Sequence, residues 1–196
     1  MADSTSHAVV GVVLRVREGR LEVLLLDGEL PSAPLARDES LEAALARAVD
    51  VGALAHVEQL ETVALAGGTI ATAYLGLAAP DAGLRGEWRA ASRVSVPLVA
   101  AAQARLRGKL SYTNVGFALA PATFTISELR EIYVAALGHD VSATNLQRVL
   151  VRRGVLERVD GRRAPGRTGG RPAALFRFRS ARLEVTDEFA ALGPPR

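Results

Sequence analysis

Two capped amphipathic segments followed by two strand-like segments form the pattern that most constrains the fold of this chain. Residues 125–128, Thr-Ile-Ser-Glu, are a capping box, in which a threonine hydroxyl and a glutamate carboxylate each accept a hydrogen bond from a free amide at a helix start. Gly138 can end that helix in a left-handed conformation, and a second helix is expected from about Ser142 to Arg153. The apolar stripes of the two helices are Leu129, Ile132, Tyr133, Ala136 and Leu137, and then Leu146, Val149 and Leu150.

A basic hairpin is expected directly after the second helix. VLERV at 155–159 and ALFRFR at 174–179 have the composition of strands, and they flank the Gly/Pro-rich loop DGRRAPGRTGGRP. Helix, turn, helix and a basic hairpin are together the parts of a winged helix-turn-helix. The pattern therefore predicts a DNA-binding winged helix domain over 121–182.

The charge of the chain is concentrated in this second half. Residues 103–182 carry 15 Lys or Arg against 5 Asp or Glu, whereas residues 1–102 carry 8 against 13, so the overall charge of +3 conceals a basic module. A folded segment this basic indicates a polyanionic partner, most commonly nucleic acid. A solvated basic face, or a wing that binds protein, is the alternative.

The residues expected to contact DNA lie on the second helix and on the loop. Asn145, Gln147 and Arg148 are near the helix start, where arginine can bond guanine and an amide can bond adenine in the major groove. Later arginines of the helix suit phosphate contacts, and loop arginines suit the backbone or the minor groove. The complete set is Thr144, Asn145, Gln147, Arg148, Arg152, Arg153, Arg162, Arg163, Arg167 and Arg171.

The first half of the chain has the pattern of a mixed α and β domain. Two strands within 8–27 join at Glu18-Gly19, and 56–65 and 69–77 form a hairpin around Gly67-Gly68. A helix is expected over about 39–49, capped by Asp38 or Ser40 and closed by Gly52, and another begins at Pro97. We expect a sensing and dimerisation domain over 1–98, connecting helices over 99–120, the winged helix over 121–182 and a tail over 183–196.

Both halves resemble the Nudix-related transcriptional regulators of NAD metabolism. FTISELREIY, NLQRVL and GRPAALFRF resemble their C-terminal domain, and HVEQLETV, IATAYLGL and Trp88 before VPL resemble their N-terminal half. The resemblance implies an α+β fold in which a Nudix-like α/β/α sandwich precedes the winged helix. It also implies an ADP-ribose-like nucleotide as effector. A homodimer on a palindromic double-stranded operator is expected, because a two-fold protein imposes two-fold symmetry on its site.

The catalytic segment of the Nudix family is degenerate in this chain. A functional Nudix box has a glycine pair after Leu-Pro and a helix with glutamates that hold Mg²⁺, but here Ser32-Ala33 follows Leu30-Pro31. Ala48 stands where the first metal glutamate would be, and the Glu-Glu pair is missing. Mg²⁺ requires an octahedral set of oxygen ligands, so no hydrolysis, catalytic residue or metal site is predicted. Glu39 and Glu42 are interpreted as acids that complement the dipole of a first helical turn.

The favoured hypothesis is a transcription repressor of NAD or nucleotide metabolism genes, with no cofactor and a nucleotide effector. Two alternatives stay open: a constitutive DNA-binding protein whose Nudix-like half only dimerises, and an altered Nudix hydrolase with an appended nucleic-acid module. The chain has no cysteine, no apolar run near the ~20 residues of a membrane span and no signal peptide pattern. These features predict a cytoplasmic protein associated with the nucleoid.

Overall fold

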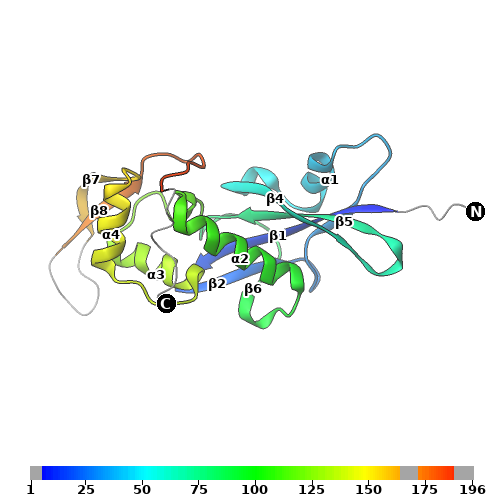
Figure 1. Cartoon of the computed structure of the whole chain (residues 1–196), viewed down its shortest axis with the longest axis horizontal. Helices are drawn as coiled ribbons and strands as arrows, with labels where there is room; N and C mark the ends of the chain where they lie inside the picture. The colour runs from blue at the N-terminus through cyan, green and yellow to red at the C-terminus, as the bar shows by residue number, and fades with distance from the viewer. Residues whose placement is uncertain (1–5, 164–171, 188–196) are drawn as a thin grey trace, which may run out of the picture. The chain divides into compact units, whose positions relative to one another are not determined.

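The computed structural model describes residues 6–163 and 172–187, which fall into two compact units (Figure 1). The division lies inside helix α2 (Pro97–Tyr112), between Arg105 and Leu106, and the hairpin tip Val16–Arg20 is grouped with the second unit. Among the described residues, no helix combines the length and the apolar character needed to cross a bilayer.

The first unit is built on a six-stranded sheet. The strand order is β4-β5-β1-β2-β6, with β3 also paired to β1; β1 and β5 run parallel, and the β1–β3, β2–β6 and β4–β5 pairs are antiparallel. The expected strands in the first half are therefore confirmed. The strands are β1 (His7–Arg17), β2 (Arg20–Leu25), β3 (Ser32–Pro34), β4 (His56–Ala64), β5 (Ile70–Leu77) and β6 (Glu87–Ala90).

Strand β1 is buried on both faces, which explains its nearly continuous apolar sequence. One face, with Val9 and Val13, packs in a cluster with Ala44 and Leu45 of helix α1 (Leu41–Ala48). The other face, with Val10, Val12 and Leu14, is buried as well. Helix α2 is tied to the same unit because Arg105 donates hydrogen bonds to the carbonyls of Gln59 and Leu60 on β4.

Helix α1 is shorter than the sequence predicts. The Ser40 side chain accepts a hydrogen bond from Ala43 N and caps the start, so Asp38 is not the cap. The helix ends at Ala48 because Val49 is already extended, and Gly52 lies in a separate short turn of 3-10 helix. The expected closure by Gly52 is therefore wrong, and α1 stops one turn earlier.

The second unit contains the predicted helix, turn, helix and hairpin. The capping box at Thr125 and Glu128 is confirmed in both hydrogen bonds, and Gly138 ends α3 with a φ of 77°. Phe124 exchanges backbone hydrogen bonds of 2.9 and 2.8 Å with Phe176, which extends the hairpin sheet by one bridge. The elements are α3 (Ile126–Leu137), α4 (Ala143–Arg152), β7 (Leu156–Arg163) and β8 (Ala173–Phe178).

The chain does not leave the second unit after β8. Val185 forms a bridge with Thr113, and Asn114 is bonded through its amide to the backbone of Arg182 and Glu184. Residues 180–187, here called the return segment, therefore run along the residues that follow α2. Part of the segment expected to be a tail is paired backbone.

Two glycines near the end of α2 differ in what surrounds them. A Cβ added at Gly108 would meet nothing within 4 Å, but one at Gly116 would lie 2.6 Å from the hydroxyl oxygen of the buried Tyr133. Gly108→Ala should raise the free energy of unfolding by about 0.5–1 kcal/mol, because alanine loses less backbone entropy in a helix. Gly116→Ala should lower it by about 1–3 kcal/mol through overpacking. Urea unfolding followed by circular dichroism measures both, and a Gly116→Ala variant as stable as the wild type would contradict the packing.

Candidate nucleic-acid interface and ligand pocket

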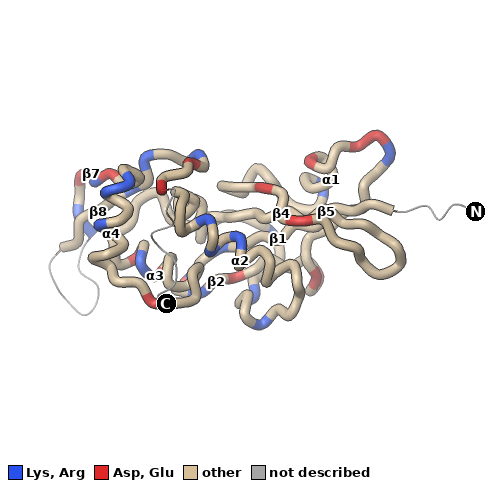
Figure 2. Tube along the Cα trace, in the orientation of Figure 1, with Lys and Arg blue, Asp and Glu red and all other residues tan. Residues whose placement is uncertain are grey.

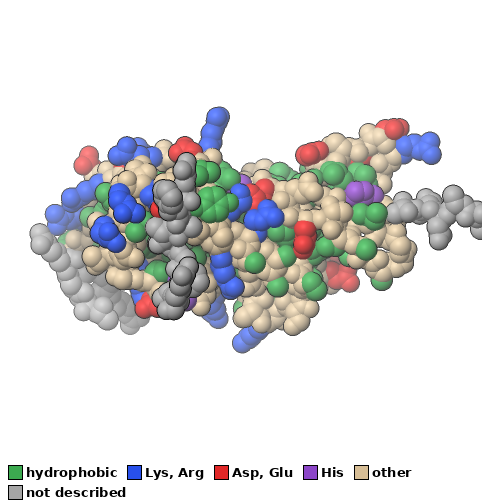
Figure 3. Space-filling model, in the orientation of Figure 1, with side chains coloured by type: hydrophobic (Ala, Val, Ile, Leu, Met, Phe, Trp, Pro, Cys, Tyr) green, Lys and Arg blue, Asp and Glu red, His purple; other side chains and the backbone are tan. Residues whose placement is uncertain are grey.

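Helix α4 has one buried face and one exposed polar face. Leu146, Val149 and Leu150 are at most 3% exposed, which fixes how the helix is rotated against its unit. The residues turned to solvent are Thr144, Asn145, Gln147, Arg148 and Arg152, and α4 contains no acidic residue. Figures 2 and 3 show Lys and Arg gathered around α4, β7 and β8. A polar, cationic helix face of this kind can contact base edges and phosphates.

Arg148 and Asn145 act as a pair on this face. The Arg148 Nη2 atom donates a hydrogen bond of 2.7 Å to Asn145 Oδ1. The bond limits the rotamers of both side chains, and both residues are exposed. The hydrogen bond between the two residues is an addition from the structure.

Val151 also lies on the exposed surface of α4, and sequence reasoning missed it. Its side chain is 51% exposed, although it is apolar. It stands three residues after Arg148, outside the stripe formed by Leu146, Val149 and Leu150. Its position outside that periodic stripe is the signal that could have identified it. A branched apolar group in this position can contact a thymine methyl group.

The interpretation of Arg153 as a phosphate contact is wrong. Its side chain is 2% exposed and forms an ion pair of 2.8 Å with Asp187. The same Nη2 atom donates a hydrogen bond of 2.6 Å to the carbonyl of Ser111. Arg153 points into its own unit because it follows Arg152 by about 100° around the helix axis, toward the buried side.

The hairpin presents fewer free cations than its sequence suggests. Arg162 is exposed, but Arg163 forms an ion pair of 3.0 Å with Glu128, the acid of the capping box. Arg177 of β8 is likewise paired with Glu157 of β7. The remaining predicted wing residues, Arg167 and Arg171, lie outside the described residues.

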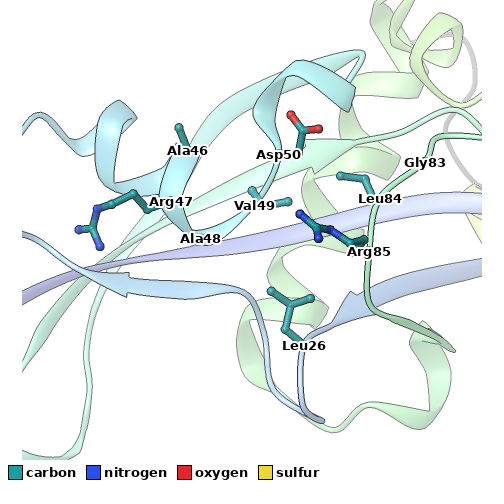
Figure 4. Close-up of a pocket in the computed structure, with 9 residues that line it drawn as sticks. All are labelled: Leu26, Ala46, Arg47, Ala48, Val49, Asp50, Gly83, Leu84 and Arg85. Atoms are coloured by element: carbon teal, nitrogen blue, oxygen red, sulfur yellow. The ribbon is translucent and has the colours of Figure 1, made fainter.

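A pocket of about 450 Å³ lies at the C-terminal end of α1 in the first unit (Figure 4). Its charged residues are Arg47, Asp50 and Arg85. The guanidinium of Arg85 points toward the end of α1, whereas that of Arg47 points away from Arg85. Arg85 is exposed, so its charge is available to a ligand. The whole lining is Leu26, Ala46, Arg47, Ala48, Val49, Asp50, Gly83, Leu84 and Arg85.

Glu39 serves as an anchor for α1. Its carboxylate accepts hydrogen bonds of 2.7 Å from both Nε and Nη2 of Arg47 and one of 2.9 Å from Ala36 N. The hydrogen bonds from Arg47, and then that from Ala36, lower the pKa of Glu39 to about 2. Glu39 precedes the helix, so Glu42 is the acid of the first turn. Within the described ranges, no three His, Cys, Asp or Glu side chains lie close enough together to hold a metal ion.

The comparisons with known proteins agree with this geometry. Residues 116–178 match the family model of the NrtR DNA-binding winged helix domain. A curated relative from Acinetobacter baylyi, named ADPR responsive transcriptional repressor NtrR, is 38% identical over 81 residues, which is 41% of this chain. The chain spans about a third (31%) of the length of that relative.

Two solved structures have the same fold. Shewanella oneidensis NrtR complexed with a 27mer DNA matches with a TM-score of 0.71 at 23% identity, covering 88% of this chain and 93% of that one. A MutT/nudix family protein from Enterococcus faecalis matches with a TM-score of 0.63 at 17% identity, covering 92% of this chain and 90% of that one. The predicted fold class and the resemblance to Nudix-related transcriptional regulators are thereby confirmed.

The pairing of Glu39 with Arg47 predicts a specific acid titration. The carboxylate should titrate with a pKa of about 2, and Arg47→Ala should raise that pKa toward the ordinary value of ~4.3. Because the folded-state pKa is lowered, the stability that the pair contributes is present above the ordinary pKa and is lost as the pH falls toward about 2. The ¹³C chemical shift of the carboxyl carbon measures the titration, and Arg37→Ala, which removes an exposed neighbouring arginine, is the control. An ordinary pKa in the wild type would show that Glu39 is free to bind other partners.

Proposed function

We propose that this protein is a DNA-binding transcription repressor whose winged helix domain binds an operator under the control of a nucleotide effector. The observation that carries the proposal is the exposed face of α4, where Arg148 and Asn145 are bonded to each other above a fully packed apolar stripe. The winged helix family match and the name of the curated repressor relative support it. The fold is also that of a protein solved with a 27mer DNA.

The two classes of cation on this surface suit two kinds of contact. Arg148 is held by Asn145 on a rigid helix, so its other donors can meet the two acceptors of a guanine edge. Arg152, one turn later, suits a phosphate, and so does Arg162 at the exposed end of β7. Thr144 and Gln147 border the Arg148 and Asn145 pair. Arg167 and Arg171 are proposed to extend the phosphate contacts of the wing.

We place the effector in the pocket at the end of α1. Its volume of about 450 Å³ is in the usual range for small-ligand sites. The chain lacks the glutamates that would bring Mg²⁺ to a pyrophosphate, so the negative charge of an ADP-ribose-like nucleotide must be met by arginine. Both arginines of the pocket are exposed, but Arg47 is paired with Glu39, so we assign this role to Arg85. For the same reason we propose that the nucleotide is bound without being hydrolysed.

The biological unit in this proposal is a homodimer on a palindromic operator in the cytoplasm, at the nucleoid. Residues 1–98 would sense the nucleotide and dimerise, 99–120 would connect and 121–182 would bind DNA, while residues 183–187 of the expected tail pair with the second unit. A two-fold dimer requires half-sites about one helical turn, ~10 bp, apart or a multiple of that.

Replacing Arg148 and Arg162 should have different effects on DNA binding. Arg148→Ala should weaken operator binding by about 1–3 kcal/mol, because a base contact is lost. It should also reduce the difference in affinity between operator and random DNA. Arg162→Ala should weaken binding to operator and to random DNA by a similar factor, because one phosphate contact is lost. For the same reason it should lower the magnitude of the slope of log K against log salt concentration by about one. Fluorescence anisotropy over a salt series measures both, with Arg37→Ala as the matched arginine control.

The reverse pattern would overturn this assignment. Uniform weakening by Arg148→Ala, together with lost discrimination by Arg162→Ala, would move base recognition from the helix to the wing. If neither change alters binding, the basic surface is a solvated face and the DNA-binding function fails.

Arg85→Ala should abolish the effect of ADP-ribose on operator binding while leaving operator affinity without the nucleotide unchanged. Removing a charge-assisted contact to a pyrophosphate should weaken nucleotide binding by about 2 kcal/mol. Calorimetry with ADP-ribose, with and without EDTA, measures the affinity, and Arg93→Ala is the control at an exposed arginine in the same unit. If ADP-ribose does not change the operator affinity of the wild type, the alternative of a constitutive DNA-binding protein is favoured. Mg²⁺-dependent cleavage of ADP-ribose, lost on heating, would favour the altered hydrolase.

A further inference from the structure

Arg153 is a buried arginine with a precise set of contacts that the DNA-binding face does not use. It ends α4, and its side chain lies inside the second unit between Ser111, at the last turn of α2, and Asp187, at the end of the return segment. Within the described residues its Nε and Nη1 atoms are buried without a hydrogen-bond partner. A buried ion pair often stabilises the folded state less than an apolar residue of similar volume does. The role of Arg153 is therefore better explained by how it positions α4 than by stability.

The end of α2 is held by the return segment as well as by Arg153. The carbonyl of Tyr112 accepts hydrogen bonds from the amides of Thr186 and Asp187, at 2.8 and 3.1 Å, and from the Thr186 hydroxyl at 3.3 Å. The carbonyls of a last helical turn have no partner within their own helix. Here the carbonyl of Ser111 accepts from Arg153, at the end of α4 (the proposed recognition helix), and that of Tyr112 accepts from the return segment.

Asn114 locks the same junction from the other side. It is 1% exposed; its Nδ2 donates to the Arg182 carbonyl at 2.8 Å, and its Oδ1 accepts from the amide of Glu184 at 2.8 Å. Its own amide donates to the carbonyl of Glu184 at 3.1 Å. The junction 111–114, the return segment and Arg153 are therefore one hydrogen-bonded cluster, which we call the junction clamp.

Helix α2 is continuous across the division of the two units, beginning in the first and ending in the second. A helix transmits a displacement along its axis with little compression, because each residue is tied to the next turn. A movement of the end of α2 would thus act directly on Arg153, which is the residue that ends the recognition helix.

We infer that the Arg153–Asp187 pair of the junction clamp positions α4 by coupling it to the end of α2. Through this coupling the pair relays the state of the first unit to the face of α4 that contacts DNA. The relay rests on the repressor function proposed above. Arg153 is a positioning residue, which acts on DNA through the placement of Asn145 and Arg148.

The test compares two carboxylates of the return segment in the full chain. Asp187→Asn removes the charge that faces Arg153, and Glu184→Gln removes an exposed charge three residues away without touching the backbone bonds of the clamp. The DNA probes are a duplex selected from a random pool by the wild-type protein and an unselected duplex. The effector probe is ADP-ribose, and hydrogen exchange of residues 111–114 and 146–151 is followed in parallel.

We expect Asp187→Asn to weaken binding of the selected duplex by at least about fivefold, with less than about twofold change on the unselected duplex. Hydrogen exchange should accelerate together in 111–114 and 146–151, and any wild-type response to ADP-ribose should shrink. Glu184→Gln should match the wild type. Arg153→Gln combined with Asp187→Asn should be no worse than Arg153→Gln alone, because Arg153→Gln already breaks the ion pair with Asp187.

The outcomes separate this inference from the proposed function. If ADP-ribose leaves wild-type operator binding unchanged, the effector proposal fails, but the discrimination and exchange measurements still decide whether the clamp positions α4. If Asp187→Asn matches Glu184→Gln in every measurement, the inference that the Arg153–Asp187 pair positions α4 is wrong. A lowered unfolding temperature with unchanged discrimination would also overturn it, because the pair would then stabilise the unit without positioning the helix.

Discussion

The burial of one face of α4 is the constraint on which the surface proposed to bind DNA depends. Leu146, Val149 and Leu150 are buried in the second unit, where α4 contacts α3, and their burial fixes the rotation of the helix. Since side chains on a helix are about 100° apart, fixing the apolar stripe also fixes which polar groups face solvent. The specificity of the surface is thus set by core packing, before any polar contact is made.

The first unit belongs to a chain with the fold of a solved MutT/nudix family protein, and its described residues include no group of three His, Cys, Asp or Glu that could hold a metal ion. The pair formed by Glu39 and Arg47 anchors the start of α1, and Ala48 leaves an apolar wall at its end. A pocket of this composition can retain an anion through arginine but has no carboxylate cluster to polarise a bound water. This composition supports the proposal that the pocket binds a nucleotide through arginine.

Three buried polar residues of the second unit lie at the end of α2 and directly after it. Ser111, Thr113 and Asn114 are all at most 9% exposed, and Arg153 joins them from the recognition helix. Polar groups inside a protein cost stability unless they are paired, and their benefit is a unique arrangement. The inferred relay requires such a unique arrangement, because a displacement of α2 can reach α4 only if the contacts between them are fixed.

Local chemistry let the sequence predict most of the elements and the exposed face of α4. The capping box at Thr125, the glycine at 138 and the apolar spacings act over one to three turns, so they can be identified without knowing the rest of the molecule. The burial and pairing of Arg153 could not be predicted, because its partners Ser111 and Asp187 lie 42 and 34 residues away along the chain. The pairing of Arg163 with Glu128, and the place of Arg85 beside α1, depend in the same way on distant segments. Sequence determined which side chains carry charge and which helix presents them; only the tertiary structure decided which charges are neutralised or buried, because ion pairs and burial arise between segments that folding brings together.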